Sequence, residues 1–491
     1  MKFPSILIAA SLFAAVLAMP MAAQENKAKH HKYKLIDMGT FGGPNFFFNF
    51  SGAPNTLLNS EGIVTGQSDT TTVDPYCFGS PDCFVEHALQ WQDGVLIDLG
   101  TLPGGANSQA FSINTRGIIA GFSQNGEIDP LLINQPPPWG PQVLHATIWK
   151  DGQITDLGTL GGYLSFGQAI NGNGQVVGIA LNPIPDPISM FGLYVGTQMR
   201  AFLWNGGALQ DLGTLGGNDA WAYLVNEHGS VAGISFTNTT INQVTGLPTT
   251  DPFLWTKAGG MQDLGSLGGA FGSANGLNKR GRVVGFSNLA GDLTFHPFSW
   301  TPSAGMRDLG TFGGNNGQAN AVNDVGEIVG KTDLPGSKTH DGFFWKHGVM
   351  TDLGTVDGDP CSNAIAINSR GQVVGTSSDC VAGLHAFLWE NGGPMVDLNT
   401  LVPPHPGVQL TGGDIYINDS GDILSIGVLS NGDAHAFLLI PCDENHADGG
   451  DCEDRGGDPA LGQPGPVRNT RRTAPKTRPV WDHRNLGGGG I

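Results

Sequence analysis

Short apolar runs, separated by glycine-rich polar turns, recur at regular intervals along this chain. The runs belong to a sequence unit of three phrases in fixed order, D-L-G-T-L-G-G, I-N-x-x-G-Q-V-V-G and H-A-F-L-W, of which we count eight copies. The first phrase begins at Asp37, Asp98, Asp156, Asp211, Asp263, Asp308, Asp352 and Asp397. The second places its asparagine at Asn59, Asn114, Asn171, Asn226, Asn278, Asn323, Asn368 and Asn418. The third ends at Trp91, Trp149, Trp204, Trp255, Trp300, Trp345, Trp389 and Leu439. A period of this length indicates a repeat architecture.

Each copy predicts two β-hairpins and therefore four short strands. Asn171 and Gly174 stand at the first and fourth positions of a type I turn, where Asn accepts from the backbone and Gly tolerates positive φ. Apolar runs flank this turn on both sides, as a hairpin requires. A second turn follows the tryptophan, as at Lys150 to Gly152. We interpret the repeated asparagines as turn residues.

The third strand of the unit predicts how the sheets pack. Residues 201–204, A-F-L-W, are apolar without alternation. A strand that is buried on both faces needs a neighbouring layer on each side. Four-stranded sheets stacked in this way form a β-propeller, so we expect an all-β fold with about eight four-stranded blades. A β-solenoid or an open stack of sheets is the alternative.

The two ends of the repeated region complement each other. The region opens on a strand of the fourth type, Tyr33 to Met38, and its last copy stops at a strand of the third type, Ala434 to Ile440. Pairing them would close the ring and remove two exposed sheet edges. The first copy is atypical after Gly43, from Pro44 to Pro54, which leaves seven blades as the alternative count.

The three phrases together resemble the HAF-repeat family of extracellular bacterial repeat proteins. The resemblance covers about Tyr33 to Ile440, and Arg200, Asp251 and Asp341 depart from the histidine that opens the third phrase. It implies export and a repeated β architecture. It assigns no catalytic residue.

The residues outside the repeats predict export. Lys2, an apolar run from Ile6 to Ala18 and small residues near Ala23 are typical of a signal peptide. We expect a signal peptide at 1–23, a flexible segment at 24–32, the propeller at 33–440 and a disulfide-containing, mostly disordered tail at 441–491. The mature protein is then secreted or extracytoplasmic, without membrane insertion, and we expect a monomer.

The charge of the chain limits the class of partner. Its net charge is −19, with 43 acidic residues against 24 Lys and Arg. Phosphate surfaces are bound by patches of basic residues, so we expect no nucleic-acid partner. The acidic cluster beside Cys442 and Cys452 is the one place where calcium is an option, although it lacks the D-x-D-x-D-G spacing. We assign no other cofactor and no metal.

The six cysteines indicate an oxidising compartment. We predict disulfides between near neighbours, one of the fifteen connectivities open to six cysteines. The predicted pairs are Cys77 with Cys83, Cys361 with Cys380, and Cys442 with Cys452. No C-x-x-C spacing supports zinc.

The repeated polar residues are expected to serve the scaffold. The histidines that open the third phrase are His87, His145, His296, His385 and His435. Copies of one residue on successive blades lie too far apart to ligate one ion, so we expect each histidine to bond a neighbouring turn or aspartate. For the same reason the repeated aspartates cannot form the carboxylate pair of a glycosidase.

Function is expected where the copies differ, which is mainly between the second and third strands. The unit shortens from 61 residues between Asp37 and Asp98 to 45 between Asp352 and Asp397. Four long loops are therefore expected side by side on one rim. Our candidate ligand-binding residues on them are Tyr76, Phe78, Glu127, Asp129, Trp139, Phe191 and Tyr194.

These loops predict an exported, non-enzymatic binding or scaffold module. Rigid loops with aromatic side chains are common recognition surfaces, and we expect a carbohydrate or an extracellular protein as ligand. The alternative is an extracellular polysaccharide lyase or hydrolase in which Glu127, Asp129 or Asp186 acts as acid or base. No nucleophile motif or metal set supports that alternative.

Overall fold

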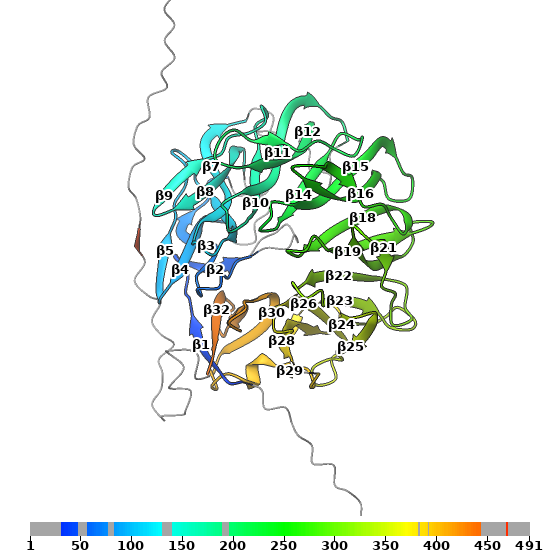
Figure 1. Cartoon of the computed structure of the whole chain (residues 1–491). Helices are drawn as coiled ribbons and strands as arrows, with labels where there is room; N and C mark the ends of the chain where they lie inside the picture. Colours follow the sequence, from blue (N-terminus) through cyan, green and yellow to red (C-terminus); the bar gives the residue numbers. More distant parts are fainter. Residues whose placement is uncertain are drawn as a thin grey trace, which may run out of the picture.

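The structure is a computed structural model that describes residues 31–47, 56–76, 83–129, 140–188, 196–381, 383–390, 392–442 and 468–469. The described chain is nearly all β, with one short 3-10 helix, η2 (Leu398–Thr400). Its strands pair as antiparallel four-stranded sheets that surround a common centre (Figure 1). The first strands of the sheets, such as β10 and β30, lie nearest this centre, and β5, β9 and β25 lie at the periphery. The predicted all-β fold of four-stranded units is confirmed.

Each sheet follows the chain from its first strand to its fourth. The strands of the first four sheets in chain order are β2 (Gly42–Phe47), β3 (Val64–Val73), β4 (Phe84–Gln92), β5 (Val95–Asp98); β6 (Ser108–Ile113), β7 (Ile119–Ile128), β8 (Gln142–Lys150), β9 (Gln153–Asp156); β10 (Ser165–Ile170), β11 (Val176–Pro185), β12 (Thr197–Trp204), β13 (Gln210–Asp211); and β14 (Ala220–Val225), β15 (Val231–Ile241), β16 (Pro248–Thr256), β17 (Gly260–Asp263). The strands that follow are β18 (Gly268–Leu277), β19 (Val283–Leu289), β20 (Phe295–Thr301), β21 (Gly305–Asp308); β22 (Gly317–Val322), β23 (Ile328–Asp333), β24 (His340–Lys346), β25 (Val349–Asp352); and β26 (Cys361–Ile367), β27 (Val373–Ser378), β28 (Gly383–Trp389), β29 (Val396–Asp397).

The last sheet combines strands from both ends of the repeated region. It contains β30 (Val408–Ile417), β31 (Ile423–Leu429), β32 (Ala434–Pro441) and β1 (Tyr33–Asp37). β1 is antiparallel to β32, from the pair Tyr33–Pro441 to the pair Asp37–Phe437. Separately, β33 (Arg468–Asn469), from the segment after the repeats, pairs in parallel with β5.

The turn between the first two strands has the geometry that its sequence predicts. The Oδ1 of Asn171 accepts the backbone N–H groups of Asn173 (3.1 Å) and Gln175 (3.0 Å). The N–H of Gly174 donates to the Asn171 carbonyl at 2.9 Å, and Gly174 has φ of 85°. Glycine adopts this left-handed conformation without a steric penalty. The predicted hairpin at this position is confirmed.

The repeated asparagine also makes a bond that the sequence does not predict. Its amide Nδ2 donates to the backbone carbonyl of the matching asparagine in the next copy, at 2.9–3.1 Å. The series runs from Asn59 through Asn114, Asn171, Asn226, Asn278, Asn323, Asn368 and Asn418, and Asn418 donates to the carbonyl of Asn59. The asparagines therefore join successive sheets as well as forming turns.

Apolar residues of the third strands bury both faces of each sheet. Phe202 on β12 belongs to a cluster that includes Ile148 of β8, whereas its neighbour Leu203 belongs to a cluster that includes Ala222 of β14. Alternate side chains of a strand point to opposite faces, so β12 packs against one sheet on each side. This confirms the prediction that was drawn from the unbroken apolar run.

The glycine that ends Q-V-V-G is required by close packing inside the sheet. A Cβ on Gly178 would collide with the carbonyl oxygen of Phe166 on the paired strand β10. The register shifts beside this point, between Gly167 and Ala169, so that Gln168 forms a β-bulge. Only glycine lets the backbones approach so closely.

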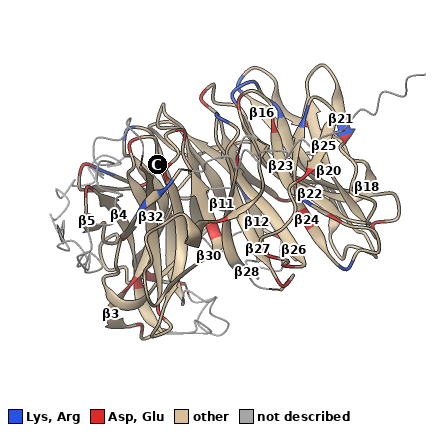
Figure 2. Ribbon diagram, turned by 90° about the horizontal axis from the view of Figure 1, so that it is seen from below, with Lys and Arg blue, Asp and Glu red and all other residues tan. Residues whose placement is uncertain are grey.

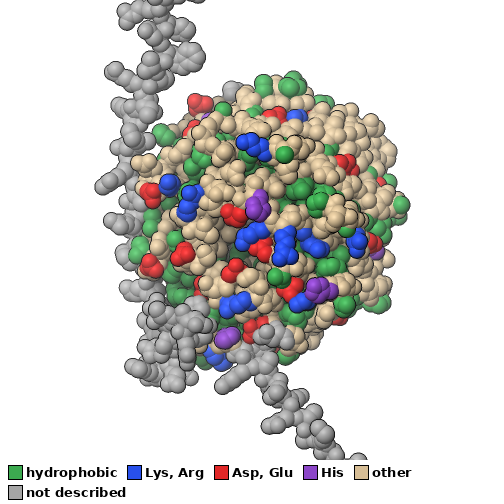
Figure 3. All heavy atoms as spheres, in the orientation of Figure 1, with side chains coloured by type: hydrophobic (Ala, Val, Ile, Leu, Met, Phe, Trp, Pro, Cys, Tyr) green, Lys and Arg blue, Asp and Glu red, His purple; other side chains and the backbone are tan. Residues whose placement is uncertain are grey.

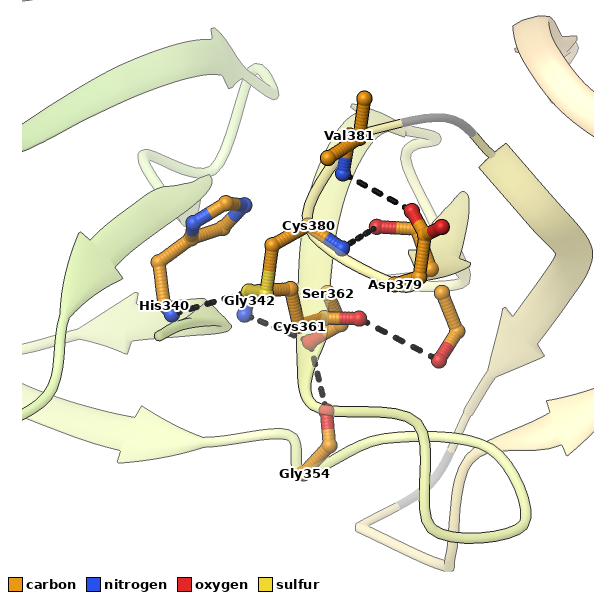
Figure 4. The surroundings of a disulfide bond; sticks show 10 residues. His340, Gly342, Gly354, Cys361, Ser362, Asp379, Cys380 and Val381 are labelled. Carbon is orange, nitrogen blue, oxygen red and sulfur yellow. Dashed lines mark hydrogen bonds between the residues drawn. A yellow bond between two sulfur atoms is a disulfide. The ribbon is translucent and has the colours of Figure 1, made fainter. Parts of the chain in front are cut away.

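The disulfide between Cys361 and Cys380 is confirmed (Figure 4). Cys361 begins β26, and Cys380 lies in the connection after β27, with Cα atoms 5.1 Å apart. Cys83 and Cys442 are also disulfide-bonded. Cys77 and Cys452, their predicted partners, lie outside the described residues, so those two pairings remain predictions.

Candidate functional site

The antiparallel order of the strands gives the molecule two different faces. Connections from second to third strands share one face with the connections between sheets, and we call this the loop face. Turns from first to second and from third to fourth strands lie on the opposite side, the turn face. Figure 2 views the sheets edge-on and places blue Lys and Arg segments along the upper edge near β16 and β21.

The long connections on the loop face are closed at their base. Asp74, Asp129 and Asp186 follow the second strands of three successive sheets. Their backbone N–H groups donate across the base of the loop, to the carbonyls of Cys83 (2.9 Å), Pro141 (3.1 Å) and Gly196 (3.0 Å) respectively. In the next sheet Asn242 makes the same bond to the carbonyl of Leu247 at 2.9 Å. One position therefore closes the long loop in four consecutive copies.

Side chains at this position also attach three of the four loops to the following sheet. Asn107 Nδ2 donates to Asp74 Oδ2 at 2.9 Å, and Asn218 Nδ2 donates to Asp186 Oδ1 at 3.1 Å. Asn242 Nδ2 donates to Asp292 Oδ2 at 3.1 Å. These bonds tie the bases of three of the four loops to the sheets that follow, and we call this row of loop bases the wall.

Asp129 occupies the equivalent place in the second long loop. Asp129 is 7% exposed. Burial of Tyr163, in the next connection, and secondly the charge of Asp129 raise the pKa of Tyr163 to about 12. A carboxylate near a phenol disfavours the ionised phenol. Asp129 therefore belongs to the base of the loop, although the sequence suggested it as a ligand contact.

Two other candidate residues lie on the described part of this wall. Tyr76 is partly buried, its N–H donates to Asp74 Oδ1 at 2.8 Å, and it lies so close to Gly140 that a side chain there would collide with it. Glu127 is exposed near the end of β7. Phe78, Trp139, Phe191 and Tyr194 lie outside the described residues.

The burial of Asp129 and Asp186 bears on the hydrolase or lyase alternative. Asp186 is 2% exposed and holds Asn218. A general acid or base must reach the substrate within hydrogen-bonding distance. Two of the three carboxylates on which that alternative depends are therefore buried at the base of the loops.

The histidines that open the third phrase pair with aspartates, as predicted. The pairs are His87–Asp98 (3.0 Å), His145–Asp156 (2.9 Å), His296–Asp308 (2.8 Å), His435–Asp37 (2.9 Å) and His385–Asp359 (2.8 Å), each through Nδ1. Burial alone would raise the pKa of Asp156. The bonds from His145 and from the Gly158 N–H outweigh burial, so the pKa lies below its ordinary value. The structural role predicted for these histidines is confirmed.

Three copies replace this histidine, in two different ways. Arg200 keeps a donor there, because its Nε donates to Asp211 Oδ2 at 3.0 Å. Asp251 and Asp341 instead face the carboxylates of Asp263 and Asp352. Burial first and the facing carboxylate second raise the pKa of Asp251 and of Asp341 to about 6. The Oδ1 atoms of Asp251 and Asp341 have no hydrogen-bond partner within the described part of the chain.

Among the described residues, no group of three or more His, Cys, Asp or Glu is placed to hold a metal ion. None of the described helices is long and apolar enough to cross a membrane. The acidic cluster after Cys442, the one calcium option, lies beyond the described residues.

Comparison with known proteins does not assign the chain to a family. No family model matches it, and no curated protein matches it. Solved structures that align with it include TolB from Acinetobacter baumannii, with 11% identity over 61% of this chain and 76% of TolB, at a TM-score of 0.29. A gluconolactonase from Xanthomonas campestris aligns with 10% identity over 61% of this chain and 81% of its own, at a TM-score of 0.27. A protein of unknown function from Dyadobacter fermentans aligns with 12% identity over 84% of this chain and 98% of its own, at a TM-score of 0.33. Scores this low carry no argument about function.

Proposed function

We propose that the protein is a closed β-propeller of eight blades that works as a non-enzymatic binding module. The pairing of β1 with β32 supports closure, since it completes the last sheet with a strand from the other end of the repeats. The bond from Asn418 to Asn59 supports it independently, because it repeats between the last and first copies the link found between all others. Blade number then follows the number of repeated asparagines.

The ligand in this proposal is a carbohydrate or an extracellular protein, bound by the loops of the first four repeats. The observation that carries the proposal is the common construction of these loops, each closed by the backbone N–H of an Asp or Asn at one position and three of them tied by that side chain to the next sheet. Pre-ordered loops lose little conformational entropy when they bind. The later repeats lack such long connections.

Export is part of the same proposal. The Cys361–Cys380 disulfide supports a non-cytoplasmic compartment, because cytosolic thiols are kept reduced. The signal-peptide pattern at residues 1–23 supports it from the sequence.

The loop face can be tested by removing two of its aromatic side chains. We would combine Tyr76→Ala with Trp139→Ala and screen glycan arrays and defined extracellular proteins against both forms. The matched control is Val349→Ala, since Val349 is 64% exposed and follows a turn on the opposite face. We expect a ligand of the unaltered protein to bind at least tenfold more weakly to the double variant and normally to the control. Equal retention of every ligand by the double variant, with unchanged melting temperature, would rule out this face.

A further inference from the structure

A second candidate site lies on the turn face, between the sheets β18–β21 and β22–β25. It is a cavity of about 480 Å³, a volume typical of small-molecule sites. Arg282, from the turn before β19, forms one wall, and Trp345 to His347, at the end of β24, form another. Val325 to Glu327, in the turn before β23, complete the lining.

Arg282 brings a positive charge into this cavity. Its Cζ lies 6.0 Å from the centre of the Trp345 ring, and its Nη1 donates to the neutral hydroxyl of Ser299 at 2.8 Å. Burial and, after it, the nearby Arg307 lower the pKa of the guanidinium. An arginine beside a second cation gains from any anion that binds between or beside them.

The one carboxylate in the lining, that of Glu327, is already paired with Lys346 and Asn323. Glu327 Oε1 pairs with Lys346 Nζ at 2.7 Å, and Glu327 Oε2 accepts from Asn323 Nδ2 at 2.7 Å. These bonds hold Glu327 against its own sheet and offset its charge with that of Lys346. The charge of Arg282 thus remains available to a ligand.

The apolar part of the cavity suggests more than a bare anion. Five of the repeated tryptophans, Trp91, Trp149, Trp255, Trp300 and Trp389, are only 2–7% exposed, whereas Trp345, like Trp204, is partly exposed. Val325 beside it is 58% exposed. An indole ring and an aliphatic side chain can pack against the C–H groups of a sugar ring while the guanidinium binds a carboxylate in bidentate fashion.

Comparison among the repeats separates this site from the scaffold. The residue equivalent to Arg282, fourth after the repeated asparagine, is Ile63, Ile118, Gln175, Ser230, Glu327, Gln372 and Asp422 in the other copies. Arginine therefore occurs there once. The space-filling view shows Lys and Arg side chains near the middle of the face turned to the viewer, with Asp and Glu side chains beside them (Figure 3).

We propose that this cavity binds a uronic acid residue of an acidic polysaccharide, with its carboxylate on Arg282 and its ring against Trp345 and Val325. The site lies on the face opposite the long loops and stands independently of the function proposed for them. A protein could therefore hold one ligand on each face.

The proposal is tested by titrating the full-length protein with oligogalacturonate. The neutral galactose oligomer of equal length and inorganic phosphate serve as comparison ligands. We expect oligogalacturonate to bind at least tenfold more tightly than either. Absence of oligogalacturonate binding would overturn the proposal, and equal affinity for phosphate would overturn the assignment of a sugar.

Substitutions at one turn separate the cavity from general electrostatic attraction. Arg282→Gln is expected to weaken oligogalacturonate binding 10- to 100-fold. Arg282→Lys keeps the charge but loses the bidentate guanidinium geometry, so its affinity is expected to lie between those of the unaltered protein and Arg282→Gln. Arg280→Gln is the matched control, because Arg280 is an exposed arginine two residues away that does not line the cavity. Equal loss from Arg280→Gln and Arg282→Gln at unchanged melting temperature would contradict a defined site. Tyr76→Ala is expected to leave this binding unchanged, so failure of either proposal can be recognised separately.

Discussion

At the scale of single residues, the repeated asparagine has one role that the sequence predicts and one that it does not. Its Oδ1 closes the turn, which the spacing to the following glycine predicts. Its Nδ2 donates to a backbone carbonyl in the next copy, and a backbone carbonyl leaves no mark in the sequence, because every residue has one. The local role of such a residue can be predicted, and its role between repeats cannot.

The carboxylate pairs make a prediction about pH. Burial and the facing Asp352 raise the pKa of Asp341 from its ordinary 3.8 to about 6. Between these two values the folded protein binds more protons at Asp341 than the unfolded chain does, so the free energy of unfolding falls as the pH rises from about 4 to about 6. Asp341→His would introduce the pairing found in four other copies. At pH 7 we expect the variant to have a higher melting temperature than the unaltered protein, and a free energy of unfolding greater by about 1 kcal/mol after allowance for solvent screening. This difference is expected to shrink toward pH 4.

The reciprocal substitution provides the control for this prediction. His296→Asp, facing Asp308, introduces a carboxylate pair into a neighbouring sheet that lacks one. It is expected to lower the melting temperature at pH 7 and to lower it less at pH 4. Differences that do not depend on pH would contradict the electrostatic explanation. Both series need only thermal melts across pH 4 to 7.

At the scale of elements, the four-stranded unit follows from sequence and its irregularities do not. The apolar third strand and the two turn signals define the unit in every copy. The β-bulge in the first strand, which displaces Gln168 in one copy and Tyr223 in another, has no fixed residue type. Only the glycine opposite the bulge hints at it, and a glycine in a strand has several explanations.

One histidine pairs differently from its copies for a local reason. His385 bonds Asp359, and the aspartate of its own sheet, Asp397, accepts instead from the side-chain Nδ2 of Asn399 at 2.8 Å. Here the phrase reads D-L-N-T in place of D-L-G-T. The sequence therefore marks the departure, although it does not identify the new partner.

The sequence predicts where the long loops lie, but it does not predict which of their side chains are buried. Surplus length located the loops, because insertions are tolerated where a connection meets solvent. Asp129 is buried at a loop base that its backbone N–H closes by donating to the Pro141 carbonyl, and its charge acts on Tyr163 in the next connection. Contacts between residues so far apart in sequence follow only from the fold.

Removing one disulfide tests how much a single cross-link contributes to its sheet. Cys361 and Cys380 are separated by 19 residues and tie the start of β26 to the connection after β27. Closing a loop of this size in the unfolded chain is worth about 3 kcal/mol. We expect the double variant Cys361→Ala, Cys380→Ala to lose up to about this amount in urea unfolding. An unchanged midpoint in the variant would show that the cross-link contributes nothing to global stability.

At the scale of the whole molecule, the two faces differ in chemistry because they differ in construction. The turn face is made of short connections of nearly constant length, so its variation lies in single side chains such as Arg282. The loop face varies by whole segments, anchored at a shared position. Ligands that need one well-placed group suit the first face, and larger ligands suit the second.

Closure of the ring makes a quantitative prediction about two equivalent asparagines. Asn323 Nδ2 donates to the Asn368 carbonyl and to Glu327, and Asn418 Nδ2 donates to the Asn59 carbonyl and to Asp422. Asn→Asp keeps the turn-forming oxygen and replaces the donor with a second acceptor, which faces the carbonyl. Loss of such a buried bond costs about 1–3 kcal/mol. In a closed ring Asn323→Asp and Asn418→Asp are expected to lower the free energy of unfolding equally. In an open array Asn418 would have no copy to bond, and its substitution would cost measurably less in the same urea titration.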